Sequence, residues 1–264
     1  MFGVRNIVVG DPSRAKVVYT AHYDTCPVLP FPNFITPKSI PIYLLYNLAI
    51  VAGFLVVAFA IGFVGGIVSA ACNLGQSFAL WSSEIAYLAL LLIFFAGPAN
   101  KHTANDNTSG ITLLIDIMSE LPVEKRNDVA FIFFDLEEMG LIGSSSFARE
   151  HKNDMKERLL INFDCVSDGE NMLFVLCKKA VVHRATIEKA FEAKDGFKVE
   201  VAEKGVFYPS DQVKFPCGVG VASLRSTKGG LLYMNRIHTR RDTVYKEENI
   251  EFLKDGAIQL SMLI

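Results

Sequence analysis

Short apolar runs alternate with amphipathic stretches along most of the chain. Five runs are rich in Val, Ile and Phe and lack polar alternation, which is typical of strands covered on both faces. They occupy residues 16–24, 128–135, 158–164, 171–177 and 218–224. Apolar residues recur at helical spacing in four other stretches, residues 108–121, 143–152, 180–194 and 246–263. This order predicts an α/β fold, with a central mixed, largely parallel sheet flanked by helices.

One region breaks this alternation because it is apolar throughout. Residues 42–72 and 78–97 are joined by the polar link 73–77, and Glu84 is the only charged residue among them. Each apolar piece is long enough to cross a bilayer, which takes about 20 residues. A run of about thirty uncharged residues is too long for an amphipathic helix. We therefore predict a transmembrane helical hairpin that contacts the lipid bilayer through residues 42–97. A buried helical pair in a soluble core or an oligomer interface is the alternative.

Two details bear on how this hairpin packs. Gly62 and Gly66 form a GxxxG motif that would let the two helices approach closely. Glu84 lies near Trp81, which fits a place close to the membrane interface, although an acid inside a membrane can also be functional.

The hairpin returns the chain to the side of the membrane that it left. Lys38 and Lys101 flank its open end and the link has no Lys or Arg, so the positive-inside rule places the main domain in the cytoplasm. The first residues show no apolar segment of a signal peptide. Five cysteines without CxxC spacing suit a reducing compartment. We expect a membrane protein with two spans, in which residues 39–99 are inserted into a domain formed by residues 1–38 and 100–264.

Composition sets further limits. A chain of 264 residues suits one domain with an insertion, and its mean hydropathy of +0.31 comes mostly from the apolar region. A formal net charge of -2 gives no indication of nucleic-acid binding. The chain has neither a P-loop nor a GxGxxG motif.

Side chains that can bind metals follow three of the predicted strands. His22 and Asp24 follow the first strand, Glu137 and Glu138 the second, and Asp164 the third. Ligands bind beyond the carboxyl ends of the strands in open α/β sheets. We therefore expect these side chains to meet at one edge of the sheet.

Two more candidates lie in loops, Asp106 in "HTANDNTSG" and His238 in "NRIHTRRDT". Taken singly, Asp106 could be a helix cap, His22 a hydrogen-bonded core histidine and Asp164 a turn residue. Taken together, five oxygen and nitrogen ligands at the expected edge of one sheet indicate a metal site.

Five short motifs carry a resemblance to a known family. The segments "AHYDT", "ANDNTSG", "FFDLEEMGLIGS", "NFD" and "HTRRDT" occur in the order and spacing of the M28 family of di-zinc aminopeptidases. The resemblance covers nearly all of the chain except the hairpin. It implies a zinc-exopeptidase fold, two Zn²⁺ ions and hydrolysis of N-terminal residues from peptides.

The resemblance also implies a role for each metal-binding residue. Asp106 would bridge the two zinc ions. His22 and Asp164 would complete one metal site, and Glu138 and His238 the other. This donor set makes chemical sense, because carboxylates and neutral imidazoles suit Zn²⁺.

Three neighbouring acids would support these ligands. By resemblance, Glu137 would be the general base that takes a proton from the metal-bound water. Asp24 would orient His22, and Asp242 would do the same near His238.

Some positions depart from the family pattern. Ile237 stands where microbial members often have a Tyr that helps to hold the tetrahedral intermediate, and Tyr208 and Tyr233 are the candidate substitutes. The segment "YPSDQVKF", which contains Asp211, resembles the family's Ser-Asp-His loop with Gln212 in place of His, and could line the substrate pocket.

Two further features lie outside the motifs. Arg240 and Arg241 could bind a substrate carboxylate, or be solvated surface residues. The longer region usual before the first strand in the family is missing, so we expect a minimal enzyme or a fragment.

Related families leave other activities open. The M20 family shares the order of ligands but usually carries a dimerisation domain before the last histidine, and only 74 positions separate Asp164 from His238. Glutaminyl cyclases bind one zinc and do not need His22. A deacylase, carboxypeptidase or amidase acting on a non-peptide substrate stays open. A catalytically inactive membrane receptor or scaffold on the same fold is the other alternative, although such a protein usually loses ligands.

The hairpin lies between His22 and Asp106 in the sequence, at the mouth of the expected site. We hypothesise that it holds the active site close to the lipid surface, where peptides released at the membrane would be favoured substrates.

Overall fold

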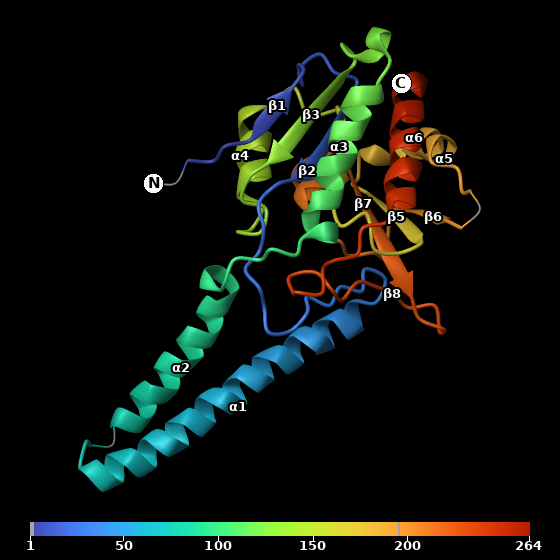
Figure 1. Ribbon diagram of the computed structural model, residues 1–264. Coiled ribbons are helices and arrows are strands. Elements are labelled where there is room, and N and C mark those ends of the chain that lie inside the picture. Colours follow the sequence, from blue (N-terminus) through green and yellow to red (C-terminus); the bar gives the residue numbers. More distant parts are fainter. Residues whose placement is uncertain (1–2, 76, 195) are drawn as a thin grey trace.

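The core of the molecule is a mixed sheet of eight strands (Figure 1). The computed structural model describes residues 3–75, 77–194 and 196–264. Within them the strand order is β1-β3-β2-β4-β7-β5-β6, with β8 paired to β7. The β3-β2-β4-β7 run and the β5-β6 pair are parallel, and the other pairs are antiparallel. The predicted mixed, largely parallel sheet is confirmed. The strands are β1 (Ile7–Val9), β2 (Val17–His22), β3 (Val129–Phe134), β4 (Leu159–Phe163), β5 (Asn171–Leu176), β6 (Lys198–Ala202), β7 (Gly218–Ser226) and β8 (Leu232–Tyr233).

The five predicted strands are β2, β3, β4, β5 and β7, and all are almost entirely buried. The other three strands were not predicted. β1 and β6 lie at the edges of the sheet, β8 has only two residues, and all three are partly or wholly exposed. β1 and β8 are too short to give a recognisable apolar run, and β6 alternates polar and apolar residues because at most one of its faces is covered.

Helices cover both faces of the sheet. Leu113 of α3 and Leu253 of α6 belong to one buried cluster, together with Tyr19 of β2, whereas Phe147 of α4 packs with Val18 in another. Adjacent residues of β2 therefore face opposite layers, as the strand period requires. The helices are α1 (Ile40–Cys72), α2 (Ser77–Ala96), α3 (Ser109–Glu120), α4 (Ile142–Glu150), α5 (Arg184–Ala190) and α6 (Glu247–Leu263), with short helical turns at Ala104–Thr108, Val123–Lys125, Ala180–His183 and Asp211–Lys214.

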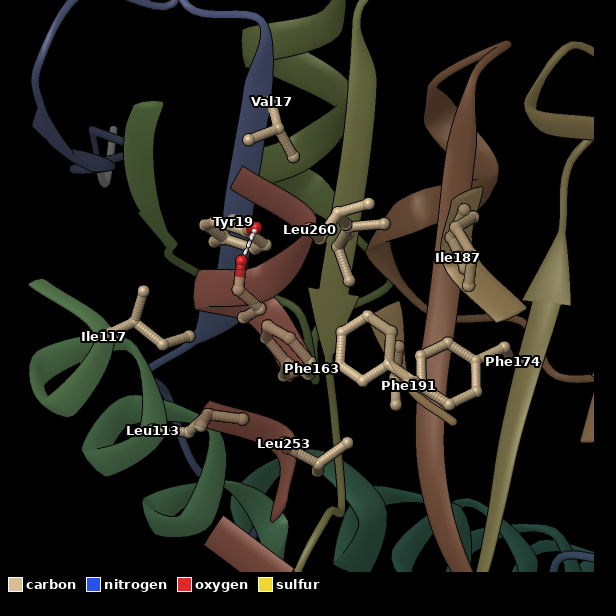
Figure 2. Packing of buried hydrophobic residues seen from close by; sticks show 14 of the residues in the cluster. Val17, Tyr19, Leu113, Ile117, Phe163, Phe174, Ile187, Phe191, Leu253 and Leu260 are labelled. Atoms are coloured by element: carbon tan, nitrogen blue, oxygen red, sulfur yellow. Dashed lines mark hydrogen bonds between the residues drawn. The ribbon is translucent and has the colours of Figure 1, made fainter. Parts of the chain in front are cut away.

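A buried tyrosine ties the C-terminal helix to the centre of the sheet (Figure 2). The hydroxyl of Tyr19 donates to the backbone oxygen of Ala257 over 2.6 Å and lies 2.9 Å from Ser261 Oγ. Its ring stacks on Phe163 of β4. Because the buried hydroxyl is hydrogen-bonded, the strand that ends in His22 is held without the cost of an unpaired polar group.

The apolar region forms a helical hairpin that projects away from the sheet (Figure 1). α1 and α2 pack closely at the end far from the sheet and spread apart toward it. A Cβ atom on Gly62 would lie 2.9 Å from Ser83 Cβ, and one on Gly65 would overlap Ser82. Close approach of the helices at Gly62 is confirmed, with Gly65 rather than Gly66 as the second tight position. Residue 76 of the predicted link lies outside the described residues.

Among the described residues, α1 alone is long and apolar enough to cross a membrane by length and composition. Only 17% of its most apolar window is buried, which is low for the core helix of a soluble protein. The described apolar stretch of α2, Ser77–Ile93, is shorter.

The open end of the hairpin is fastened to the loops at the carboxyl edge of the sheet. The backbone of Val28 donates to Pro98 and that of Leu29 donates to His238, each over 2.8 Å. The hydroxyl of Tyr46 in α1 donates to Pro32 over 2.6 Å. The start of α1 is therefore fixed beside the edge where the candidate site residues lie.

Candidate metal centre

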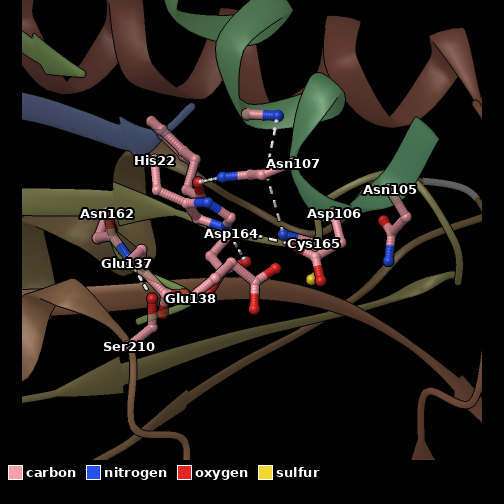
Figure 3. A network of polar contacts seen from close by, with 12 residues as sticks. His22, Asn105, Asp106, Asn107, Glu137, Glu138, Asn162, Asp164, Cys165 and Ser210 are labelled. Carbon is pink, nitrogen blue, oxygen red and sulfur yellow. Dashed lines mark hydrogen bonds and ion pairs between the residues drawn. The ribbon is translucent and has the colours of Figure 1, made fainter. Parts of the chain in front are cut away.

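Three of the five candidate ligands lie at the ends of three neighbouring parallel strands. His22 is the last residue of β2, Glu138 lies beyond the end of β3, and Asp164 directly follows β4. Because the carboxyl ends of β3, β2 and β4 meet at one edge, the three side chains converge there (Figure 3). The convergence expected from the sequence is confirmed by this geometry.

Asp106 lies between two histidines. Its Oδ1 is 3.2 Å from His22 Nε2, and its Oδ2 is 2.9 Å from His238 Nε2. Asp164 Oδ1 lies 3.5 Å from His22 Nε2, and Glu138 Oε2 lies 3.2 Å from His238 Nε2. Each imidazole therefore faces two carboxylates, and Asp106 is the carboxylate that the two groups share.

These donors fit the two zinc sites that the resemblance implies. Ligand atoms of His22, Asp106 and Asp164 lie within 4.8 Å of one another, and those of Glu138 and His238 form a second group within the same limit. All five side chains offer the oxygen or nitrogen donors that Zn²⁺ takes in proteins. The arrangement is therefore chemically suited to two cations that share Asp106.

Backbone contacts hold the ligand loops in place. Asp242 accepts hydrogen bonds from the backbone nitrogens of Asn105 and Asp106, at 2.8 and 2.9 Å. Asn107 donates to the backbone oxygen of Phe163 over 3.0 Å and fixes the same turn against the end of β4 (Figure 3). Asp242 therefore contacts the turn that carries Asp106, and its expected role near His238 stays a prediction.

Asp24 supports two elements at once. Its carboxylate accepts the backbone N–H groups of Glu137 and Glu138, at 2.9 and 3.1 Å. Its Oδ1 also lies 3.5 Å from His22 Nδ1, which faces the Asp24 backbone oxygen at 3.2 Å. The expected contact with the His22 imidazole is present. Asp24 also holds the turn after β3, which the sequence did not predict.

Buried acids dominate the electrostatics of the site. Burial alone lowers the pKa of His22 and His238, but the carboxylates around them raise both pKa values well above the usual range. Burial also raises the pKa of Glu137 well above its usual range, against the opposing effect of His22, and raises that of Glu138. Bound cations would stabilise the charged carboxylates, so the electrostatic balance favours positive ions here.

A hollow of about 340 Å³ gives access to the ligands. Glu137 lines it together with all five candidate ligands, and Tyr208 and Ile237 line it too. Tyr43 from the first turn of α1 adds part of its wall, so the hairpin contributes to the candidate site.

The two tyrosines proposed from the sequence lie in different places. Tyr208 lines the hollow, and its hydroxyl donates to the backbone oxygen of Asp164 over 3.0 Å. Tyr233 lies on β8, where its ring contacts Phe34 and the guanidinium of Arg225. Only Tyr208 therefore adjoins the ligands.

The remaining candidates lie around the site. Asp211 is fully buried, and burial raises its pKa to about 7. Arg240 and Arg241 line a separate hollow of about 770 Å³ against Leu92 and Ala96 at the end of α2.

Cys26 was not among the predicted site residues. Its sulfur belongs to the group formed by Glu138 and His238, within the same 4.8 Å limit, and its backbone nitrogen donates to Glu138 Oε1 over 3.1 Å. Its position two residues after Asp24, in the segment "AHYDTC", was the available signal.

The sequence was compared with known protein families. The family model described as peptidase family M28 matches residues 92–260. The chain belongs to peptidase family M28. The matched M28 region includes Asp106, Glu138, Asp164 and His238, whereas His22 precedes it.

Two solved structures with TM-scores above 0.5 show the same fold as this M28 chain. BSAP, a zinc aminopeptidase from Bacillus subtilis, has a TM-score of 0.53 at 16% identity. The match covers 97% of this chain and 48% of the BSAP chain. The gamma-secretase component nicastrin has a TM-score of 0.51 at 9% identity, and the match covers 98% of this chain and 42% of the nicastrin chain. LapA aminopeptidase of Legionella pneumophila has a TM-score of 0.49 at 13% identity, and the match covers 97% of this chain and 52% of the LapA chain. The chain spans about half the length of these proteins. A comparison with curated proteins found no match.

The role of Asp242 can be tested by Asp242→Ala. Loss of the two hydrogen bonds to the backbone at Asn105 and Asp106 is expected to weaken zinc binding by about 10- to 100-fold. Competition with a chelator measures this affinity. Asp255→Ala, which removes an exposed acid on α6, serves as the control. Unchanged zinc affinity in Asp242→Ala would show that Asp242 does not position Asp106.

Proposed function

We propose that the chain is a membrane-anchored, zinc-dependent exopeptidase, an aminopeptidase that removes N-terminal residues from peptides. The observation that carries this proposal is that five metal-binding side chains and Glu137 line one hollow. Membership of the M28 family supports a peptidase, and the zinc aminopeptidase BSAP has the same fold.

The ligands divide into two sites that share one carboxylate. His22 and Asp164 would hold one Zn²⁺ with Asp106, and Glu138 and His238 would hold the other with the same Asp106. When bound, the two ions would lower the pKa of a coordinated water and polarise the scissile carbonyl group.

Glu137 is the residue that moves the proton. It lines the same hollow as the ligands, and its backbone is held by Asp24. Its carboxylate accepts a proton from the attacking water and passes it to the nitrogen of the leaving amine. The amine therefore leaves as a neutral group.

The size of the hollow favours a chain end. Its volume of about 340 Å³ is small for a peptide that continues in both directions. This volume supports an aminopeptidase over an endopeptidase.

A receptor or scaffold on the same fold would have no use for this arrangement. It would not need two ligand groups around a shared carboxylate, or a buried acid beside them. The complete ligand set favours the enzyme.

We also propose that residues 39–99 form a two-span membrane insertion in the domain made by residues 1–38 and 100–264. The length of α1 and the exposed apolar surface of both helices support it. Because both ends of the hairpin are fastened to the site loops, it would hold the catalytic domain against the bilayer, on the cytoplasmic side.

The general base can be tested by Glu137→Gln in detergent-purified protein. Two zinc ions per chain are expected to remain, while kcat on aminoacyl-nitroanilides falls by about 10²- to 10⁴-fold, because the amide cannot accept the proton. Glu251→Gln, an exposed position on α6, is the control.

Two outcomes would overturn these roles. A Glu137→Gln protein with two zincs and full activity would remove Glu137 from the mechanism. A wild-type protein that binds no zinc would contradict the proposed zinc-dependent enzyme activity.

The membrane arrangement can be tested at Cys72, the exposed cysteine at the tip of the hairpin. In intact cells a membrane-impermeant maleimide is expected to label the wild-type chain and not Cys72→Ser, because two spans place the tip outside. The chain is also expected to stay in the membrane pellet after an alkaline wash. Labelling only after permeabilisation would contradict the orientation, and release by the wash would contradict the anchor.

A further inference from the structure

A separate hollow, of about 770 Å³, lies where α2 ends beside the domain. Leu92 and Ala96 line it from α2, Leu29 from the loop after β2, and Arg240 and Arg241 from the turn between β8 and α6. The hollow therefore combines apolar walls with two positive charges. We call it the α2 hollow.

The α2 hollow adjoins the apolar outer surface of the hairpin. Ile85, Leu88 and Leu92 follow one another at helical spacing along α2, and all three are exposed. α2 has 20 residues, so it is about 30 Å long, which matches the hydrocarbon core of a bilayer. When α2 spans the membrane, its last residue, Ala96, would lie at the level of the lipid headgroups.

Arg240 and Arg241 place positive charge at this same level. Both side chains are exposed, and within the part of the chain that the structure describes neither forms an ion pair with a carboxylate. Arg241 donates to the backbone oxygen of Asn235 over 3.4 Å, a long hydrogen bond. A guanidinium group can bind a phosphate through two parallel hydrogen bonds, and basic hollows beside membrane-spanning helices bind anionic headgroups.

We propose that the α2 hollow binds one anionic phospholipid of the bilayer. This inference rests on the proposed membrane insertion of the hairpin. The phosphate group would lie between Arg240 and Arg241, and one acyl chain would lie along Ala89 and Leu92. Burial of the acyl chain and pairing of the phosphate both favour this ligand. A zwitterionic lipid would bring its own cation close to the two arginines, which is less favourable.

The α2 hollow is also joined to the segment of a candidate metal ligand. The backbone nitrogen of Leu29 donates to the backbone oxygen of His238 over 2.8 Å. The backbone nitrogen of Arg241 donates to the hydroxyl of Thr239 over 3.1 Å, within the same turn. A lipid held by the arginines would therefore fasten the segment that carries His238 to the membrane surface.

Lipid binding to the full chain in detergent micelles tests the inference. The probes are a phosphatidylglycerol and a phosphatidylcholine that carry the same fluorescent acyl chain, and fluorescence anisotropy measures their binding. The wild-type chain is expected to bind the phosphatidylglycerol at least about tenfold more tightly. Arg240→Gln combined with Arg241→Gln is expected to abolish this preference. Lys125→Gln combined with Arg126→Gln, which removes the same charge before β3 at the opposite edge of the sheet, is expected to keep it.

The apolar wall is tested with the same probes. Ala96→Trp, which fills the hollow beside the arginines, is expected to weaken phosphatidylglycerol binding at least about tenfold. Leu80→Trp, at an exposed position near the start of α2, is expected to leave it unchanged. An excess of inorganic phosphate is expected not to displace the lipid, because the phosphate ion has no acyl chain to bury.

The outcomes separate the lipid site from the anchor. Equal binding of the two probes by the wild-type chain, or a preference that survives both arginine substitutions, overturns the lipid site. Displacement by inorganic phosphate would make the hollow a site for the free ion and would overturn it as well. Release of the wild-type chain from membranes by an alkaline wash would instead overturn the membrane insertion on which the inference rests.

Discussion

The concentration of buried carboxylates around two imidazoles is the constraint on which the rest of the structure depends. Asp106, Glu138 and Asp164 face His22 and His238 at distances of 2.9 to 3.5 Å. Two imidazoles cannot neutralise these acids and Glu137 together, and isolated buried charge is costly. Cations bound at Asp106 would resolve this imbalance, and they would also polarise a peptide carbonyl group for hydrolysis.

The α/β scaffold stabilises this arrangement because it holds the candidate ligands through their backbones. The parallel strands β3, β2 and β4 bring three chain segments to one edge, and Tyr19 locks the middle strand to α6. The carboxylates of Asp24 and Asp242 accept hydrogen bonds from backbone N–H groups of the ligand loops. Hydrogen bonds to the backbone thus set the positions of the candidate ligands, as supporting residues do in metal sites.

The hairpin changes the surroundings of this site more than its chemistry. It lies between β2 and Asp106 in the chain, and the loops at both of its ends contact the segments that carry the candidate ligands. Tyr43 reaches the hollow of the ligands, and Ile50 and Phe54 line a second hollow that shares Glu138 and His238 with it. One short stretch of α1 therefore supplies walls to both hollows.

The sequence by itself determined the central strands and the candidate ligands that meet at the edge of the sheet. Strands β2, β3, β4, β5 and β7 were predictable because burial on both faces requires continuous apolar runs, whereas β1, β6 and β8 are short, exposed or at an edge and leave no such pattern. The candidate ligands could be named because their residue types and order along the chain match the motifs of the M28 family. Only the tertiary structure placed Asp242 behind Asp106, brought the sulfur of Cys26 to Glu138, and put Arg240 and Arg241 against α2. These contacts join segments far apart in the sequence, and nothing in the local pattern of any one segment records which distant segment will lie beside it.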